Sequence, residues 1–148
     1  NIQFIWQTGS YYKENTTPEL ERYGTPRNLY VTDFIRGMDK AYKAADLVIS
    51  RAGSSSISEL CLLGKASILV PSPNVAEDHQ THNAMALVNK NAALIVKDAE
   101  AEEKLIPLAI KTVTDTTLLH TLSENALAMA FRDSDIKIAE EIFNLIKN

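Results

Sequence analysis

The residues best suited to chemistry form a short turn between an apolar run and a helix-like segment, DLVISRAGSSSISEL from Asp46 to Leu60. Gly53 lets another molecule approach the backbone closely, and a serine at 54–56 can cap the helix while its first free N–H groups point outward. A helix N-terminus carries about half a positive charge, and Arg51 adds a full one. The turn therefore predicts a site for phosphate or diphosphate.

Glu59 follows on the same predicted helix, on a different side from Ile57, Leu60 and Cys61. A carboxylate in this position can accept hydrogen bonds from two vicinal hydroxyls, such as those of a ribose. The same residues also fit a plain surface helix, in which the serines only cap, Arg51 pairs with a surface acid and Glu59 is solvated. The residues alone leave both interpretations open.

A second polar cluster, His79, Gln80 and Asn83, stands where a helix is expected to begin after a proline-stiffened loop. Gln80 and Asn83 are three residues apart, so they share a helix face and can hydrogen-bond the hydroxyl and amide groups of a sugar. The alternative is that both side chains only cap or decorate an exposed helix.

The segment VTDFIRGMD joins a predicted strand to a helix and contains Phe34, Ile35 and Met38. A flat base could lie against these apolar groups while the backbone N–H and C=O of Ile35 pair with its edge. Plain core packing is the commoner fate of such side chains.

Several other kinds of site are disfavoured. The sequence has no G-x-x-x-x-G-K-[ST], no G-x-G-x-x-G after its first strand and no G-x-S-x-G, which argues against a P-loop, ordinary dinucleotide binding and a serine hydrolase. Glu77, Asp78, His79 and His82 match no usual zinc spacing, so we expect no metal site.

Strand-like and helix-like segments alternate along the first two thirds of the chain. The expected strands are Ile2–Thr8, Leu29–Ile35, Asp46–Ser50, Ala66–Val70 and Ala92–Val96. The expected helices are Pro18–Tyr23, Met38–Ala45, Ser55–Leu63, His79–Lys90, Glu100–Thr114, Thr117–Ala130 and Asp135–Ile146. This order predicts an α/β fold with a Rossmann-like parallel sheet and helices on both faces, and a ligand site at the carboxyl ends of the strands.

Length and composition limit the remaining possibilities. The 148 residues suit one domain, and the net charge of −4 gives no overall attraction for nucleic acid. The longest apolar run, Ala126–Phe131, is far shorter than the roughly 20 residues that cross a bilayer. Because the chain begins at Asn1 in a strand-like segment without methionine or signal peptide, we expect it to be part of a longer protein.

The motifs between Val31 and Ala84 together resemble one family. FIRGMDKAYKAADLVISRAGSSSISELCLLGKASILVPSPNVAEDHQTHNA is similar to the carboxyl-terminal half of the MurG family of bacterial UDP-N-acetylglucosamine:lipid I N-acetylglucosaminyltransferases. The resemblance covers most of the chain and implies the donor-binding half of the two-domain GT-B fold.

The resemblance also implies roles for individual residues. Ile35 would read the uracil through its backbone, with Phe34 and Met38 lining that pocket. Arg51, Gly53 and Ser54 would face the diphosphate, and Glu59 the ribose. His79, Gln80 and Asn83 would hold the N-acetylglucosamine. His79 stands where some members carry a second Gln, and the turn is richer in serine than usual.

The family's reaction is an inverting transfer from UDP-N-acetylglucosamine to lipid I, which makes lipid II for peptidoglycan. It needs no metal or other cofactor. The resemblance places the catalytic base and the acceptor site outside these residues, so we name no catalytic residue and expect this chain alone not to turn over. It also implies a cytoplasmic protein, peripheral on the inner face of the bacterial membrane.

Other functions remain open. The chain could belong to another GT-B enzyme with a UDP-sugar, such as a glycolipid synthase or an epimerase. It could be a separate donor-binding subunit, a non-catalytic nucleotide-sugar sensor, or an interaction domain without a ligand.

Overall fold

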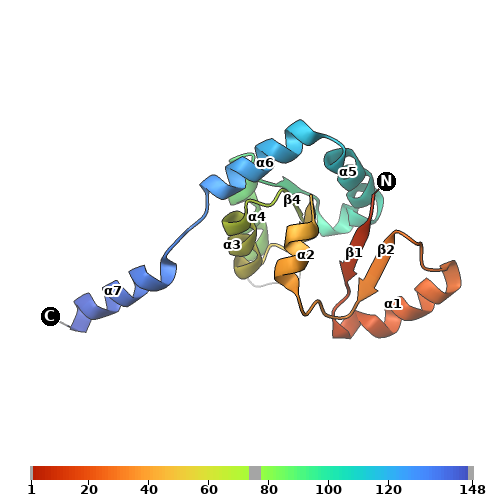
Figure 1. Cartoon of the computed structure of the whole chain (residues 1–148), viewed down its shortest axis with the longest axis horizontal. Coiled ribbons are helices and arrows are strands. Elements are labelled where there is room, and N and C mark those ends of the chain that lie inside the picture. Colours follow the sequence, from red (N-terminus) through yellow and green to blue (C-terminus); the bar gives the residue numbers. More distant parts are fainter. Residues whose placement is uncertain (1, 74–77, 147–148) are drawn as a thin grey trace. The chain divides into compact units, whose positions relative to one another are not determined.

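The structure is a computed structural model that describes residues 2–73 and 78–146 (Figure 1). The chain divides into two compact units, residues 1–45 and 46–148, which are described here one at a time. All strand pairs are parallel, which confirms the predicted α/β class. In the described residues the strands form two separate sheets.

The first unit contains two strands and two helices: β1 (Phe4–Gln7), α1 (Ser10–Tyr23), β2 (Leu29–Thr32) and α2 (Met38–Ala44). The register of the two parallel strands pairs Phe4 with Leu29 and Gln7 with Thr32. The ends of both strands therefore lie together, followed by the turns into α1 and α2.

Helix α1 is longer than the sequence predicts. Pro18, expected at its first turn, lies inside the helix, which begins at Ser10. The missing N–H of a proline destabilises a helix most where the carbonyl that it would have bonded is buried. Helix α1 has no buried residue. Water can satisfy the carbonyl, so the helix continues through the proline.

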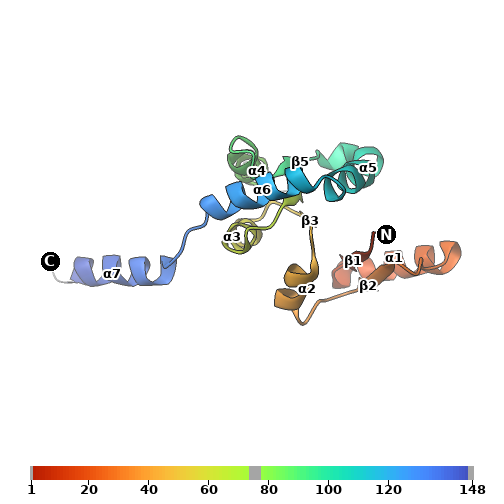
Figure 2. The same ribbon diagram turned by 45° about the horizontal axis from the view of Figure 1, so that its top comes forward.

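The second unit holds the remaining elements, which Figure 2 shows from a second direction. They are β3 (Val48–Ser50), α3 (Ser54–Leu63), β4 (Ser67–Leu69), α4 (His79–Val88), β5 (Leu94–Ile95), the 3-10 turn η2 (Asp98–Glu100), α5 (Ala101–Val113), α6 (Thr116–Ala128) and α7 (Ser134–Ile146). Each strand is shorter than the apolar run that predicted it: β3 loses residues at its start, and β4 and β5 lose residues at both ends.

The three-stranded sheet has β4 in the middle, between β3 and β5. All three residues of β4 are buried, as expected for a central strand covered on its faces. Ile68, Val70, Val96 and Ala109 form a core cluster against which α5 packs Leu105 and other side chains. This core fixes the carboxyl ends of the strands, where the candidate site lies.

The last helix, α7, contrasts with this core. Its predicted apolar stripe, which includes Ile138 and Ile142, is present, but none of its residues is buried. No helix in the described residues is long and apolar enough to cross a membrane.

Candidate functional site

The turn between β3 and α3 has the conformation that leaves helix N–H groups open. The N-cap is Gly53, with φ −67° and ψ 147°, and no side chain in the described part of the chain caps the helix. The expectation that a serine caps it was wrong, because α3 begins at Ser54 and places all three serines in its first turn. The N–H groups of 54–56 consequently have no acceptor among the described residues.

The described residues also leave open space at Gly53, next to these N–H groups. A Cβ built on Gly53 meets no atom of the described residues within 4 Å, and the φ of Gly53 is one that any residue adopts. The fold therefore does not require glycine at this position. A ligand that approaches the first turn of α3 would give glycine a function.

Arg51, just before this turn, already contacts three groups of the protein itself. Its Nη1 donates to the carbonyl oxygens of Val70 at 3.2 Å and Pro71 at 3.4 Å, and forms an ion pair with Asp98. The interpretation that Arg51 pairs with an acid is thus confirmed. Asp98 did not stand out in the sequence, because its link to Arg51 spans 47 positions.

Gln80 and Asn83 both reach the turn from α4. Gln80 Oε1 accepts from the backbone N–H of Ala52 at 3.2 Å and of Ser72 at 2.9 Å. Asn83 Nδ2 donates to the carbonyl of Ala52 at 3.1 Å. Both side chains therefore lie on the same face of α4, as predicted. His79 is exposed at the start of α4.

Glu59 is exposed on α3, whereas Leu60 and Cys61 are buried, which confirms the predicted division of faces. Burial also raises the pKa of the Cys61 thiol. A protonated, buried thiol is a poor nucleophile, so Cys61 serves packing.

In the first unit, Phe34 and Ile35 follow the end of β2 and line an open cavity of about 570 Å³. Phe34 is 67% exposed, so the alternative that it packs in the core is wrong. The N–H of Ile35 donates to Gln7 Oε1 at 2.8 Å. Met38 begins α2 and is not among the residues that line this cavity.

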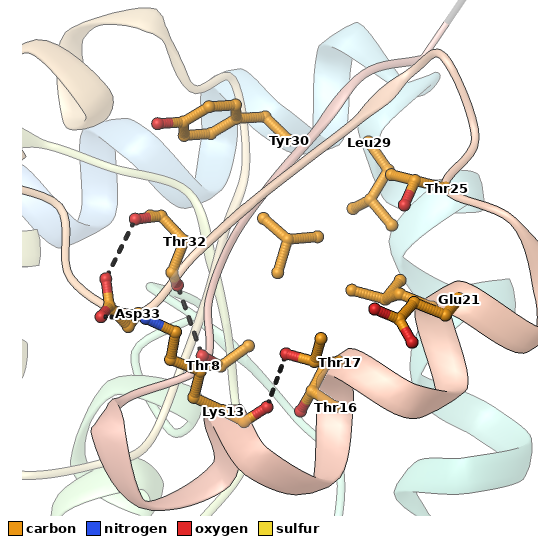
Figure 3. A pocket seen from close by; sticks show the side chains of 12 residues that line it. Thr8, Lys13, Thr16, Thr17, Glu21, Thr25, Leu29, Tyr30, Thr32 and Asp33 are labelled. Atoms are coloured by element: carbon orange, nitrogen blue, oxygen red, sulfur yellow. Dashed lines mark hydrogen bonds and ion pairs between the residues drawn. The ribbon is translucent and has the colours of Figure 1, made fainter.

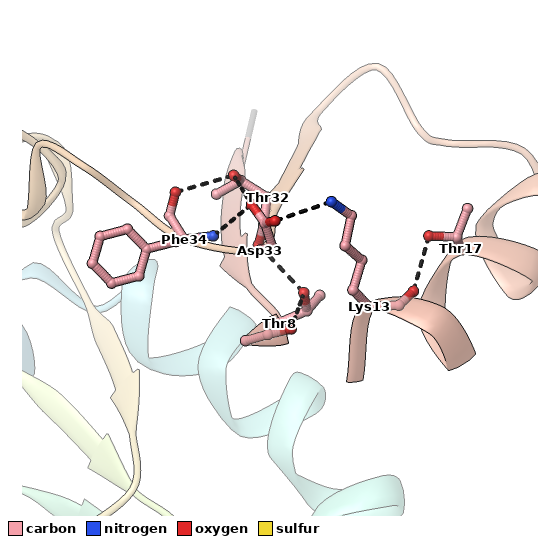
Figure 4. Close-up of polar contacts among 7 residues, drawn as sticks. Thr8, Lys13, Thr17, Thr32, Asp33 and Phe34 are labelled. Carbon is pink, nitrogen blue, oxygen red and sulfur yellow. Dashed lines mark hydrogen bonds and ion pairs between the residues drawn. The ribbon is translucent and has the colours of Figure 1, made fainter. Parts of the chain in front are cut away.

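A second groove of about 450 Å³ lies between α1 and β2 (Figure 3). It contains none of the residues that the sequence singled out. Its polar edge is the ion pair of Lys13 with Asp33 at 3.0 Å, drawn in Figure 4. The hydrogen bond from Lys13, and then its charge, hold the pKa of Asp33 below its usual range.

The described residues contain no cluster of three or more His, Cys, Asp or Glu that could hold a metal. Of the four residues weighed for such a site, Glu77 lies outside the described residues.

Comparison with known proteins decides the family. The model of the glycosyltransferase family 28 C-terminal domain matches residues 1–139. The chain belongs to this family. Its relatives include two proteins named UDP-N-acetylglucosamine--N-acetylmuramyl-(pentapeptide) pyrophosphoryl-undecaprenol N-acetylglucosamine transferase. The one from Bacteroides fragilis is 59% identical over 98% of the chain, and the one from Parabacteroides distasonis is 56% identical over 99%.

A solved structure is also similar to the chain. The crystal structure of Acinetobacter baumannii MurG superposes with a TM-score of 0.81 at 30% identity, and the match covers 95% of this chain and 42% of that one. The chain covers 38% of the Bacteroides fragilis protein and 39% of the Parabacteroides distasonis protein. It therefore spans about two fifths of the relatives that it matches.

Proposed function

We propose that this chain is the donor-binding part of an inverting glycosyltransferase that moves N-acetylglucosamine from UDP-N-acetylglucosamine to lipid I. Relatives with 56–59% identity carry the name of that transfer. The observation that carries the proposal is the uncapped first turn of α3, which follows a glycine with open space around its Cβ position. Oriented N–H groups at a helix N-terminus bind phosphate well.

The proposal assigns a part of the donor to each group of residues. Arg51, Gly53 and Ser54 would hold the diphosphate, and Glu59 would accept from the ribose hydroxyls. The amide groups of Gln80 and Asn83, with His79, would contact the N-acetylglucosamine. For the uracil we propose the residues Phe34, Ile35 and Met38.

These groups favour departure of UDP. As the bond from the anomeric carbon to the diphosphate breaks, negative charge grows on the leaving oxygen. Helix N–H groups already fixed at that position stabilise the transition state without reorganising. The lipid I hydroxyl attacks from the opposite face, which inverts the anomeric carbon, and we name no catalytic base in this chain.

The rest of the proposal concerns the whole protein. Lipid I binding and contact with the inner face of the cytoplasmic membrane would belong to residues outside this chain. We also propose that the two units together make one donor-binding domain, the carboxyl-terminal half of a GT-B enzyme.

Calorimetric titration of the intact protein with UDP-N-acetylglucosamine, UDP-glucose and UDP-galactose tests this function. We expect the first to bind tightest, and Glu59→Ala to weaken UDP binding by roughly 1–3 kcal/mol because a hydroxyl partner is lost. Glu103→Gln, an exposed acid on α5, serves as control. Preference for UDP-glucose or UDP-galactose, or no binding at all, would contradict the proposal.

A further inference from the structure

One guanidinium ties together the carboxyl ends of all three strands in the second unit. Arg51 follows β3, the carbonyls of Val70 and Pro71 follow β4, and Asp98 follows β5. Arg51 Nη1 donates to all three partners. Together with the two carbonyl contacts, the ion pair therefore connects the three strands at the edge of the sheet where the turn into α3 begins.

The neighbouring backbone is fixed as well. Ala52 is fully buried, and α4 satisfies both its N–H and its C=O through Gln80 and Asn83. Gly53, next in the chain, is the N-cap of α3. The direction of the first helical turn thus depends on two anchors, the amide pair from α4 and the Arg51–Asp98 pair.

We propose that Asp98 is a positioning residue for the diphosphate: it acts through Arg51 to hold the turn before α3 in its anion-binding conformation. This inference rests on the proposed function. A carboxylate near a diphosphate would oppose binding if only its charge mattered. Asp98 must then help binding by orienting Arg51 and the turn. A guanidinium and N–H groups that are already fixed lose no conformational freedom when the ligand binds.

These two effects predict opposite results for Asp98→Asn. Loss of repulsion alone would strengthen UDP binding. Loss of positioning weakens it, and we expect a loss of roughly threefold to tenfold, the scale of one charge-assisted hydrogen bond at a partly exposed site. Glu102→Gln makes the same change in net charge one turn along the chain and should leave UDP affinity unchanged.

Calorimetry on the intact protein with UDP and with uridine provides the test. Asp98→Asn should weaken UDP and leave uridine within about twofold, since uridine has no phosphate. General damage to the fold would weaken both. Asp98→Glu should recover part of the loss, and Arg51→Gln with Asp98→Asn should lose no more than Arg51→Gln alone, because the two residues act as one unit.

The outcomes separate the two proposals. If the unmodified protein binds UDP and Asp98→Asn binds it equally well or better, or if the two substitutions are additive, Asp98 does not position the diphosphate while the proposed function stands. Equal weakening of uridine and UDP also contradicts the positioning role. If the unmodified protein binds no UDP, both proposals fail.

Discussion

The backbone N–H of Ile35 donates to the side-chain Oε1 of Gln7 at 2.8 Å. The two residues lie 28 positions apart, yet the parallel pairing of β1 with β2 brings their strand ends together. A side-chain amide offers the same acceptor as the edge of a uracil ring. Gln7 therefore already accepts a hydrogen bond from the Ile35 N–H group, which the proposed contact with the nucleobase needs.

Gln7→Ala should strengthen uridine binding by roughly twofold to tenfold, because one exposed hydrogen bond no longer competes with the base. Titration of the intact protein with uridine measures this. Gln3→Ala, another exposed glutamine just before β1, should have no effect. Weaker uridine binding by Gln7→Ala would show that Gln7 supports the base contact instead of competing with it.

Gly53→Ala should weaken UDP binding while changing the stability of the fold only slightly. The backbone suits any residue and the added Cβ meets open space, so we expect the free energy of unfolding to change by no more than about 1 kcal/mol. The methyl group would stand where a phosphate approaches the first turn of α3, and UDP affinity should fall by at least about fivefold. Thermal unfolding and UDP titration give the two values. A stable variant with unchanged UDP affinity would contradict the placement of the diphosphate.

Thr112→Val should stabilise the protein. Thr112 is fully buried in α5, and its hydroxyl has no hydrogen-bond partner in the described structure. Valine has nearly the same shape and no polar group to bury, so we expect the free energy of unfolding to rise by about 1 kcal/mol. Denaturant unfolding measures the change. Thr121→Val, at an exposed residue whose hydroxyl donates to the Thr117 carbonyl, should give no such gain.

Removing Lys13 should raise the pKa of Asp33 toward its usual range, because the hydrogen bond and charge of Lys13 are what lower it. A lowered carboxyl pKa adds stability above the usual pKa, and this stability is lost as the pH falls through the lowered value. The stability difference between the unmodified protein and Lys13→Met should therefore disappear in acid. NMR titration of the Asp33 carboxyl tests the shift, with Lys43→Met as control, and an unchanged pKa in Lys13→Met would refute the assignment.

Local patterns predicted most of the fold. The apolar run Ala66–Val70 was recognisable as a buried strand, and the structure places β4 within it. The buried and exposed sides of α3 were also predicted correctly, since both predictions depend on the pattern of side chains along a short segment. The helix start at Ser10 was missed because proline usually begins a helix, whereas an exposed helix tolerates Pro18 in its interior.

The candidate site was only partly predictable. The three-residue spacing of Gln80 and Asn83 indicated their shared helix face, and the strand–turn–helix pattern located the turn at Gly53. It could not indicate Asp98 or Gln7, because the partners of these side chains are brought close only by the packing of distant segments. The uncapped start of α3 also required the structure, since serine at 54–56 fits a cap and a first turn equally well.

The most direct test of the account is the response of the α3 amides to UDP. In the ¹⁵N-labelled intact protein, the amide resonances of Ser54, Ser55 and Ser56 should shift on UDP addition, while those of α6 should stay in place, because the diphosphate binds the open N–H groups of the first turn. Saturable binding of UDP with the three serine resonances unmoved would contradict the account.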